Sequence, residues 1–488
     1  MSEWIRQVPR AGRTGLALLA LAGLGACDGL LEVDLPASIT ESALDDPSTA
    51  SVQVYSAIAF FECSWSELSY EALGHEDVWE RMTGVAAPAA YEEQPSTGRC
   101  DASDNGSNWY AGIHIARSMA AELYEKLGGE WSSVPDADQL RAISAIYAGA
   151  SLDVLGEHFC EMAVDAGELL SPEQTLTLAE SAIGNALAVI EATGDFAISD
   201  DISPSARAMA YGLRARIRWA KGDAAGAVAD AEQVPMGFTA WVTRDDGRER
   251  RNKVYASGLE IAYAGMHVDV NDWWTPVDRT NPVTGVPWPD PIPFTGYANL
   301  GVLPDGRAVT DEGLPIRTHA DAGSVPDPRV PTVTQQPVGG INPQPSPAKY
   351  RTSDADIPLV SWREMWLIRA ELAGGQTAID LVNDLRDAAN LPRVTYADPN
   401  DPEEIRYMVL EEKRRELFAE GGRWWATKIQ NTDLLWFPRF QGVFPVQGWP
   451  MYGGVRMIMP NSEYEQNPNT TLADRATMCS PAERPVNF

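Results

Sequence analysis

Apolar residues recur at three- and four-residue steps over much of the chain, which is the spacing of a helix that buries one face. The clearest example follows Ser171, where Pro172 suits the first helical position and Gln174 can complete a capping box. The apolar positions that then repeat are Leu176, Ala179, Ile183, Ala186, Leu187 and Ile190. An upstream segment repeats in the same way at Leu140, Ile143, Tyr147, Ala150 and Val154. Both segments are therefore predicted to be amphipathic helices of a packed helical protein.

Residues 208–234 are predicted to form a pair of helices with a tight connection. The segment AMAYGLRARIRWAKGDAAGAVADAEQV breaks at Gly222-Asp223 and is rich in alanine on both sides of the break. Small residues would let the two helices approach closely; they are Ala208, Gly212, Ala215, Ala220, Ala224 and Ala227. The pair resembles a tetratricopeptide repeat, in which helix pairs bury their apolar faces against neighbouring pairs.

Helical periodicity is lost between residues 236 and 358, where glycine, proline, aspartate and threonine cluster. The stretches NPVTGVPWPDPIPF and PVGGINPQPSPAKY contain prolines too closely spaced for long helices or central strands. Loops of this length in a compact domain are usually functional or disordered. Interleaved aromatic residues favour an ordered, functional region; they are Trp273, Trp274, Trp288, Phe294 and Tyr297.

A second helical block is predicted over residues 359–440. It opens with LVSWREMWLIRAELAGG and continues with TAIDLVNDLRDAANLP. In its next helix, the apolar spacing set by Ile405 and Met408 leads on to Glu412 and Glu416. Two carboxylates therefore lie where a core is expected, and buried acids must be paired or protonated.

Two interpretations of these acids are open. Nearby arginines favour a structural ion-pair network, which would comprise Arg369, Glu371, Arg386, Glu412, Arg415, Glu416 and Arg423. Paired acids could instead serve general acid–base chemistry. Since arginines crowd the same segment, the structural network is the preferred interpretation.

The N-terminus carries an export signal. Three arginines precede the apolar run TGLALLALAGLGACDGL, which is shorter than the roughly 20 residues that span a bilayer as a helix. This arrangement is typical of a secretory signal peptide. Leu24-Gly25-Ala26-Cys27 resembles a bacterial lipobox, so residues 1–26 are predicted to be removed and Cys27 to be lipidated. The alternative is an ordinary signal cleaved near Ala26, with Cys27 left as a free or bridged thiol.

Composition narrows the choice of partners. The chain of 488 residues has 69 acidic and 38 basic residues, a formal net charge of -31. Such a surface repels phosphate groups, so nucleic acid is excluded as a partner and membrane contact is expected through the lipid alone. No zinc-type spacing or phosphate-binding glycine loop is present, so no metal or cofactor is predicted.

Four cysteines remain after the lipidated one: Cys63, Cys100, Cys160 and Cys479. An even number in an exported chain predicts two disulfides with three possible pairings. If the first three helices run up, down and up, the first three of these cysteines lie near one end of the bundle. At least one bridge is then expected among them.

Several motifs together resemble the RagB/SusD family of nutrient-uptake outer-membrane lipoproteins. EMWLIRAE from Glu364, Asn383 with Arg386 in LVNDLRDAANL, and EEKRRELFAEGGRWW from Glu411 are similar to the family's C-terminal half. LLEVDLPASIT and NWYAGIHIARSM are similar to its mature start and second helix. The resemblance therefore covers almost the whole mature chain.

The resemblance implies an all-α, SusD-like domain over residues 27–488, built from tetratricopeptide-like helix pairs with long loop-rich insertions that form a ligand face. Its expected parts are helices over 27–235, loops over 236–358, helices over 359–440 and an irregular tail over 441–488. Family members are cell-surface lipoproteins of the outer membrane. They capture oligosaccharides, or in some cases peptides, and pass them to a SusC-like TonB-dependent transporter without catalysis.

The expected ligand contacts are loop aromatics and their polar neighbours, because a sugar's C–H face stacks on a ring while its hydroxyls bond to Asp, Asn and Arg side chains. The candidates are Asp77, Trp79, Trp273, Trp274, Asp278, Arg279, Asn281, Trp288 and Tyr297. Each aromatic could instead fill a cavity in a loop-rich domain, whereas Trp109, Trp424 and Trp425 lie on predicted helices and are expected in the core.

Two other classes of protein remain as alternatives. A secreted glycosidase would need two carboxylates roughly 5 to 10 Å apart in an open cleft. A structural helical-repeat scaffold of the envelope would need no ligand face at all.

Overall fold

The computed structural model describes the parts of the chain that follow. They are residues 44–76, 79–81, 109–247, 250–260, 264–266, 299–300, 325–326, 328–335, 344–391, 393–394, 397–432, 442–443, 450–451 and 455–480. The chain separates into two compact units, Met1–Thr49 and Ala50–Phe488. In the first unit, the short 3-10 helix η2 (Pro47–Thr49) begins after Asp46, whose carboxylate accepts a hydrogen bond from Ser48 N (2.9 Å).

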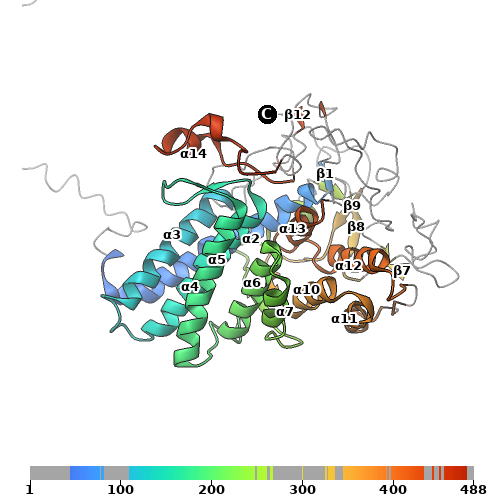
Figure 1. Cartoon of the computed structure of the whole chain (residues 1–488), viewed down its shortest axis with the longest axis horizontal. Coiled ribbons are helices and arrows are strands. Elements are labelled where there is room, and N and C mark those ends of the chain that lie inside the picture. The colour runs from blue at the N-terminus through green and yellow to red at the C-terminus, as the bar shows by residue number, and fades with distance from the viewer. Residues whose placement is uncertain are drawn as a thin grey trace, which may run out of the picture. The chain divides into compact units, whose positions relative to one another are not determined.

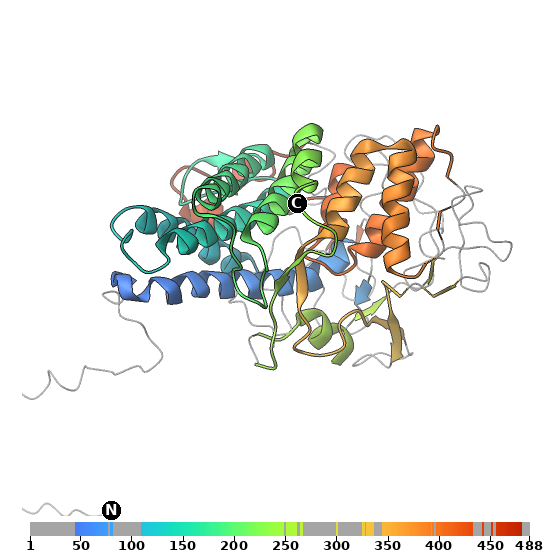
Figure 2. The same cartoon turned by 90° about the horizontal axis from the view of Figure 1, so that it is seen from below.

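The N-terminal half of the second unit is an array of helices packed in sequence order. The helices are α2 (Ala50–His75), α3 (Trp109–Gly128), α4 (Ala137–His158), α5 (Pro172–Thr193), α6 (Ala206–Lys221) and α7 (Ala224–Ala231). Each contacts the next along the chain, and α3, α4, α5 and α6 follow one another in Figure 1. Figure 2 shows α2, in blue, passing along this array toward the orange helices of the C-terminal block. The predicted all-α architecture is confirmed.

The local signals for α5, α6 and α7 act as the sequence predicts. Ser171 Oγ accepts from Gln174 N (3.2 Å), and Gln174 Oε1 accepts from Ser171 N (2.8 Å). Gly222 ends α6 with a φ of 80°, a conformation that favours a residue without Cβ. Asp223 then caps α7 by accepting from Gly226 N (3.0 Å). The predicted capping box and helix-pair connection are both confirmed.

The C-terminal block is a second group of helices. It consists of α10 (Trp362–Ala373), α11 (Gly375–Ala388), α12 (Pro402–Glu416), α13 (Arg423–Gln430) and, further on, α14 (Asn461–Gln466) and the 3-10 turn η5 (Leu472–Asp474). α10 contacts α11 and α12 on one side and α6 and α7 on the other. α10 therefore joins the two helical blocks.

The strands are short and pair two by two in antiparallel ribbons. The pairs are β1 (Trp79–Arg81) with β5 (Ala264–Met266), β2 (Met162–Ala163) with β3 (Leu169–Leu170), β4 (Thr239–Val242) with β10 (Ile357–Ser361), β6 (Asn299–Leu300) with β7 (Val325–Pro326), β8 (Thr332–Gln335) with β9 (Gln344–Pro347), and β11 (Gly442–Val443) with β12 (Pro450–Met451). A π-helix, η4 (Val254–Glu260), lies between β4 and β5 in sequence.

The prediction that the second helical block begins at residue 359 is wrong by three residues. Residues 359–361 belong to β10, whose pairing with β4 holds them extended. Val360 packs so closely on α6 that a Cβ at Gly212 would overlap its side chain. A β-branched residue suits this extended, fully buried position. α10 begins only after Ser361, whose Oγ accepts from Glu364 N (3.3 Å).

The expectation that three helix-borne tryptophans lie in the core is confirmed. Trp109, Trp424 and Trp425 are 0, 4 and 0 % exposed. Elsewhere in the core, Phe61 of α2 meets Tyr147 of α4 edge to face, with ring centroids 5.3 Å apart. Contacts of this kind join α2 to α4 across the helical array.

One disulfide joins Cys160, at the end of α4, to Cys479 near the C-terminus. Cys63 is also disulfide-bonded, and Cys100 lies outside the described residues. Because Cys160 pairs with Cys479, the bridge expected among the first three of the four cysteines can only be Cys63–Cys100, and it stays a prediction. Mass mapping of the non-reduced protein tests it directly.

None of the helices in the described stretches combines the length and the apolar character needed to cross a bilayer.

Candidate functional site

Most of the predicted ligand and anchor residues lie outside the described residues. These are Cys27, Asp77, Trp273, Trp274, Asp278, Arg279, Asn281, Trp288 and Tyr297. Trp79 is the exception, because it begins strand β1. The described residues around β1 are therefore the part of the structure from which the candidate ligand segments can be discussed.

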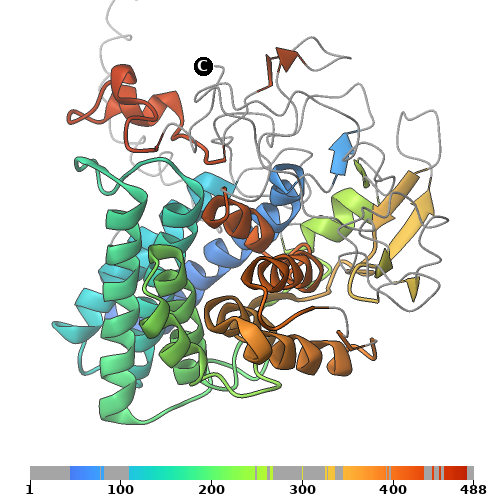
Figure 3. The ribbon, with the colours of Figure 1, turned by 45° about the vertical axis from the view of Figure 1, so that its right-hand side comes forward.

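Strand β1 brings two candidate segments to the same place. Trp79 pairs with Met266 in the antiparallel β1–β5 ribbon. Met266 is the last described residue before the stretch that carries Trp273, Trp274 and the other loop candidates. Trp79 and this stretch are far apart in sequence. Trp79 nevertheless belongs to the same two-stranded ribbon as Met266, the residue after which the stretch begins. Figure 3 shows β1 in blue beside the yellow-green η4 and the yellow strands β8 and β9.

The ribbon stands at the end of helix α2, whose last residues are buried against α13. The ring of His75 stacks on Trp425, with centroids 4.0 Å apart and planes 5° from parallel. His158 of α4 lies on the same indole at 4.4 Å. Burial lowers the pKa of His75 to about 3 and that of His158 to about 4, so both rings are neutral at pH 7.

Glu76 follows this helix and is 1 % exposed. Its Oε1 accepts from Trp425 N (3.3 Å), while Oε2 has no hydrogen-bond partner among the described residues. Burial raises the pKa of the Glu76 carboxyl to about 7, against the smaller opposing effects of the Trp425 N–H and the Lys428 charge. The last residues before this connection, His75 and Glu76, are therefore fixed by packing against Trp425.

The two acids on the apolar face of α12 lie in the interior, held by arginines. Glu412 is 0 % exposed and accepts from Arg386 Nη2 (2.5 Å) and Arg329 Nη1 (2.6 Å). Burial alone would raise the pKa of Glu412, but the two guanidinium groups outweigh it and hold that pKa below its ordinary value. Glu416 contacts the same Arg329 Nη1 (3.1 Å) and also Arg363 Nε (2.9 Å). Charges this fully paired are unsuited to a general acid.

The other residues of the predicted network are charge-paired separately. Arg423 Nε donates to Glu364 Oε1 (2.9 Å), and Arg415 Nε donates to Glu411 Oε1 (2.6 Å). Glu371 pairs with Lys413. Arg369 lies outside these clusters: it is 3.8 Å from Glu232 of the adjacent block and lies over the Trp366 ring.

Several partners of this network were not predicted. Arg216 of α6 is 0 % exposed and donates through Nη2 to Glu364 Oε2 (2.6 Å), and Arg423 also pairs with Glu157 of α4. The signal for Arg216 exists in the sequence, because it continues the apolar spacing of Met209 and Gly212 just as Glu412 continues that of α12. Arg329 has no such signal, since it lies in an irregular segment.

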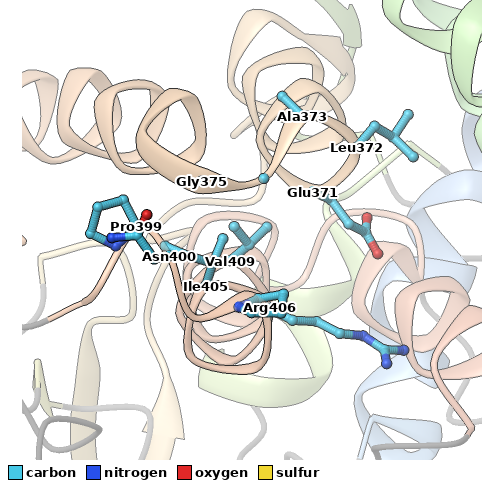
Figure 4. A pocket seen from close by; sticks show the side chains of 11 residues that line it. Glu371, Leu372, Ala373, Gly375, Pro399, Asn400, Ile405, Arg406 and Val409 are labelled. Carbon is cyan, nitrogen blue, oxygen red and sulfur yellow. The ribbon is translucent and has the colours of Figure 1, made fainter.

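A pocket of about 490 Å³ lies where α10 turns into α11 beside the start of α12. Figure 4 shows Ile405 and Val409 beneath it, with Glu371 and Arg406 on one side. These two charged groups are bridged, because Asn431 Oδ1 accepts from Arg406 Nη2 (2.7 Å) and Asn431 Nδ2 donates to Glu371 Oε1 (3.3 Å). No aromatic ring is among its lining residues, so the pocket offers no stacking surface for a sugar.

No three His, Cys, Asp or Glu side chains gather in metal-binding fashion within the part of the chain that the structure describes.

The described residues define a class of fold: a helical protein with a buried ionic core and short antiparallel ribbons. Residues 334–428 match the model of the SusD family. This segment contains Glu364, Arg386, Glu412 and Arg423, which are the centres of the buried ion pairs.

Known proteins extend this likeness over the whole fold. A SusD-like protein of Formosa agariphila, P38, is 32% identical over 131 residues, which are 23% of this chain and 24% of that protein. The match therefore spans about a quarter of that relative. A SusD-like carbohydrate binding protein from Bacteroides vulgatus superposes with a TM-score of 0.57 at 11% identity, covering 87% of this chain and 97% of the other. A SusD superfamily protein from the same species gives 0.55 at 13%, covering 89% and 99%. Residues 334–428 thus match the SusD family, and the fold of the described residues is SusD-like.

Proposed function

We propose that this protein is a lipid-anchored binding protein of the outer membrane that captures oligosaccharides at the cell surface. It delivers them to a SusC-like TonB-dependent transporter and performs no chemistry on them. Support for the proposal comes from the β1–β5 ribbon, in which Trp79 pairs with Met266, because Met266 precedes the stretch with Trp273 and Trp274 in sequence. The name of the Bacteroides vulgatus structure, a carbohydrate binding protein, supports the ligand class.

The anchor follows from Cys27 and the short apolar run before it. A lipid at this position holds the acidic protein at the membrane without any electrostatic attraction to headgroups. Mass spectrometry of the natural protein tests this part alone, since acyl chains on the mature N-terminal cysteine are expected. An unmodified mature N-terminus would refute the anchor and leave the ligand class standing.

The buried acids count against the glycosidase alternative. A glycosidase holds its two carboxylates in a cleft open to substrate and water. Glu412 and Glu416 are 0 and 6 % exposed and share the guanidinium of Arg329. Neither acid has access to a glycosidic bond in this arrangement.

The test is a binding screen with the form that lacks residues 1–27. Soluble starch, laminarin, xylan, galactomannan and polygalacturonate, together with a tryptic peptide mixture, are the probes. Binding of at least one polysaccharide without release of reducing ends is expected. Trp273→Ala with Trp274→Ala should weaken that binding by about tenfold, the loss of one to two stacking contacts.

The matched control is Trp241→Ala, because Trp241 is a half-buried tryptophan on β4 and is not one of the candidate ligand residues. The control should bind like the unaltered protein. If the protein bound peptides alone, the ligand would be a peptide and not an oligosaccharide. Release of reducing ends would overturn the non-catalytic role.

A further inference from the structure

The π-helix η4 is the least regular helical segment among the described residues. It runs from Val254 to Glu260, and β5 begins four residues later at Ala264. π-Helices are rare and occur mostly as single turns, frequently at functional sites. Here the segment lies between helix α2 and the ribbon that carries the candidate ligand segments.

The start of η4 is fixed to α2 by buried contacts. Lys253 Nζ lies 3.2 Å from Glu67 Oε1, and both side chains are 0 % exposed. Lys253 N donates to Ser66 Oγ (3.0 Å). On the other side, Asn252 Oδ1 accepts from Tyr255 N (3.0 Å) in the first turn. A buried ion pair with this support leaves little freedom at this end of the helix.

At the other end of η4, Glu260 pairs with Arg251, and a side chain of strand β8 contacts the last carbonyls. Gln335 Nε2 lies 3.2 Å from Gly258 O and 3.0 Å from Leu259 O, and 3.0 Å from Ser346 Oγ of β9. The last carbonyls of a helix lack partners within it, so they depend on such donors. Gln335 therefore ties the end of the π-helix to the β8–β9 hairpin.

The β8–β9 hairpin connects the end of η4 to the β1–β5 ribbon. β9 contacts both η4 and β5, and a Cβ at Gly258 would come within 3.1 Å of Pro347 Cγ of β9. β5 in turn pairs with β1 through Met266 and Trp79. The end of η4, the hairpin and the ribbon are thus in continuous contact.

We propose that Gln335 is a positioning residue of the ligand site: by holding the end of η4 on the β8–β9 hairpin, it sets the position of β5 against β1. It acts through the backbone of the ribbon, without touching the ligand itself. The inference rests on the proposed function, since it assigns Gln335 to the affinity of that same ligand face.

The first test needs no ligand. In Gln335→Leu, the amides of residues 79–81 and 264–266 should exchange with deuterium about tenfold faster, as expected for the loss of one or two ordinary hydrogen bonds. Amides of α4 and α5 should exchange as before. Gln376→Leu is the matched control, because Gln376 makes its side-chain hydrogen bond to Asp380 on the exposed face of α11. Unchanged exchange in the ribbon would overturn the inference.

The second test links the contact to binding. Native affinity electrophoresis in laminarin, starch, xylan, galactomannan and polygalacturonate gels should show about tenfold weaker retention for Gln335→Leu than for the unaltered protein. Gln335→Glu should behave like the leucine variant at pH 8, where the carboxylate cannot donate. It should recover retention at pH 4.5, where a protonated acid can donate to the helix carbonyls, measured against the unaltered protein at the same pH. A merely destabilised fold would not recover on acidification.

The outcomes distinguish the positioning role of Gln335 from the proposed function of the protein. Faster exchange in the ribbon with unchanged polysaccharide retention would overturn Gln335 as a positioning residue. Faster exchange with no retention of any polysaccharide by the unaltered protein would uphold the mechanical link and overturn the proposed function.

Discussion

Glu76→Gln should stabilise the protein at alkaline pH and leave it nearly unchanged at pH 5. The Glu76 carboxyl is 1 % exposed, and its only hydrogen bond among the described residues comes from Trp425 N. Burial raises its pKa to about 7, from an ordinary value of 4.5. Glutamine has nearly the same shape and can accept the same hydrogen bond, but it never ionises.

The sign follows from the raised pKa. Between pH 4.5 and 7 the folded protein keeps a proton that the unfolded chain has lost, so this contribution to stability is complete below pH 4.5. It disappears as pH rises through about 7. With about 1.4 kcal/mol per pKa unit, the difference between 4.5 and about 7 amounts to roughly 3 kcal/mol at pH 9. The glutamine variant avoids this loss.

The assay is urea unfolding of the soluble, disulfide-intact protein at pH 5, 7 and 9. The variant should have a midpoint only slightly higher than that of the unaltered protein at pH 5 and a clearly higher one at pH 9, with an unchanged slope. Glu125→Gln is the control, because Glu125 is exposed on α3, and its midpoint difference should not depend on pH. A midpoint difference for Glu76→Gln that is equal at pH 5 and pH 9 would refute the buried, proton-holding carboxyl.

Three further predictions concern packing and charge. Gly212→Ala should cost about 1–3 kcal/mol by overpacking, because a Cβ there overlaps Val360; the cost should vanish in a Val360→Ala background, and equal costs in both backgrounds would contradict it. Arg329→Met should lower stability by about 3 kcal/mol, because it removes one partner from buried Glu412; an unchanged urea midpoint would disprove this. His75→Phe should reduce the fall in stability from pH 6.5 to 4.5, since the lowered pKa of about 3 makes the folded ring resist protonation; parallel pH profiles would speak against it.

Helices were predictable wherever a single segment carried all of its own signals. The box of Ser171 and Gln174, the stripe of α5 and the break at Gly222 each lie within a few residues of the structure they cause. The Glu412 side chain was predictable as buried for the same reason, because its position on α12 follows from local spacing. A local pattern of this kind predicts which face of a helix is buried.

Features that depend on a distant partner could not be derived in this way. Residues 359–361 read as the start of a helix, and only their pairing with β4 makes them a strand. Arg329 comes to Glu412 from an irregular segment whose course is set by tertiary packing. The register of Trp79 against Met266 joins two segments that share no pattern in the sequence. Pairing choices of this kind depend on the whole fold.

The ionic core connects the two helical blocks of the fold. Arg423 of α13 binds both Glu157 of α4 and Glu364 of α10, and Arg216 of α6 binds Glu364 as well. These pairs connect the N-terminal helices to the C-terminal block through directional contacts. Replacing a buried ion pair by apolar residues is often neutral or stabilising, so its main effect here is on geometry rather than on stability. Because these pairs fix α4, α6, α10 and α13 to one another, the core holds the two helical blocks in a defined arrangement.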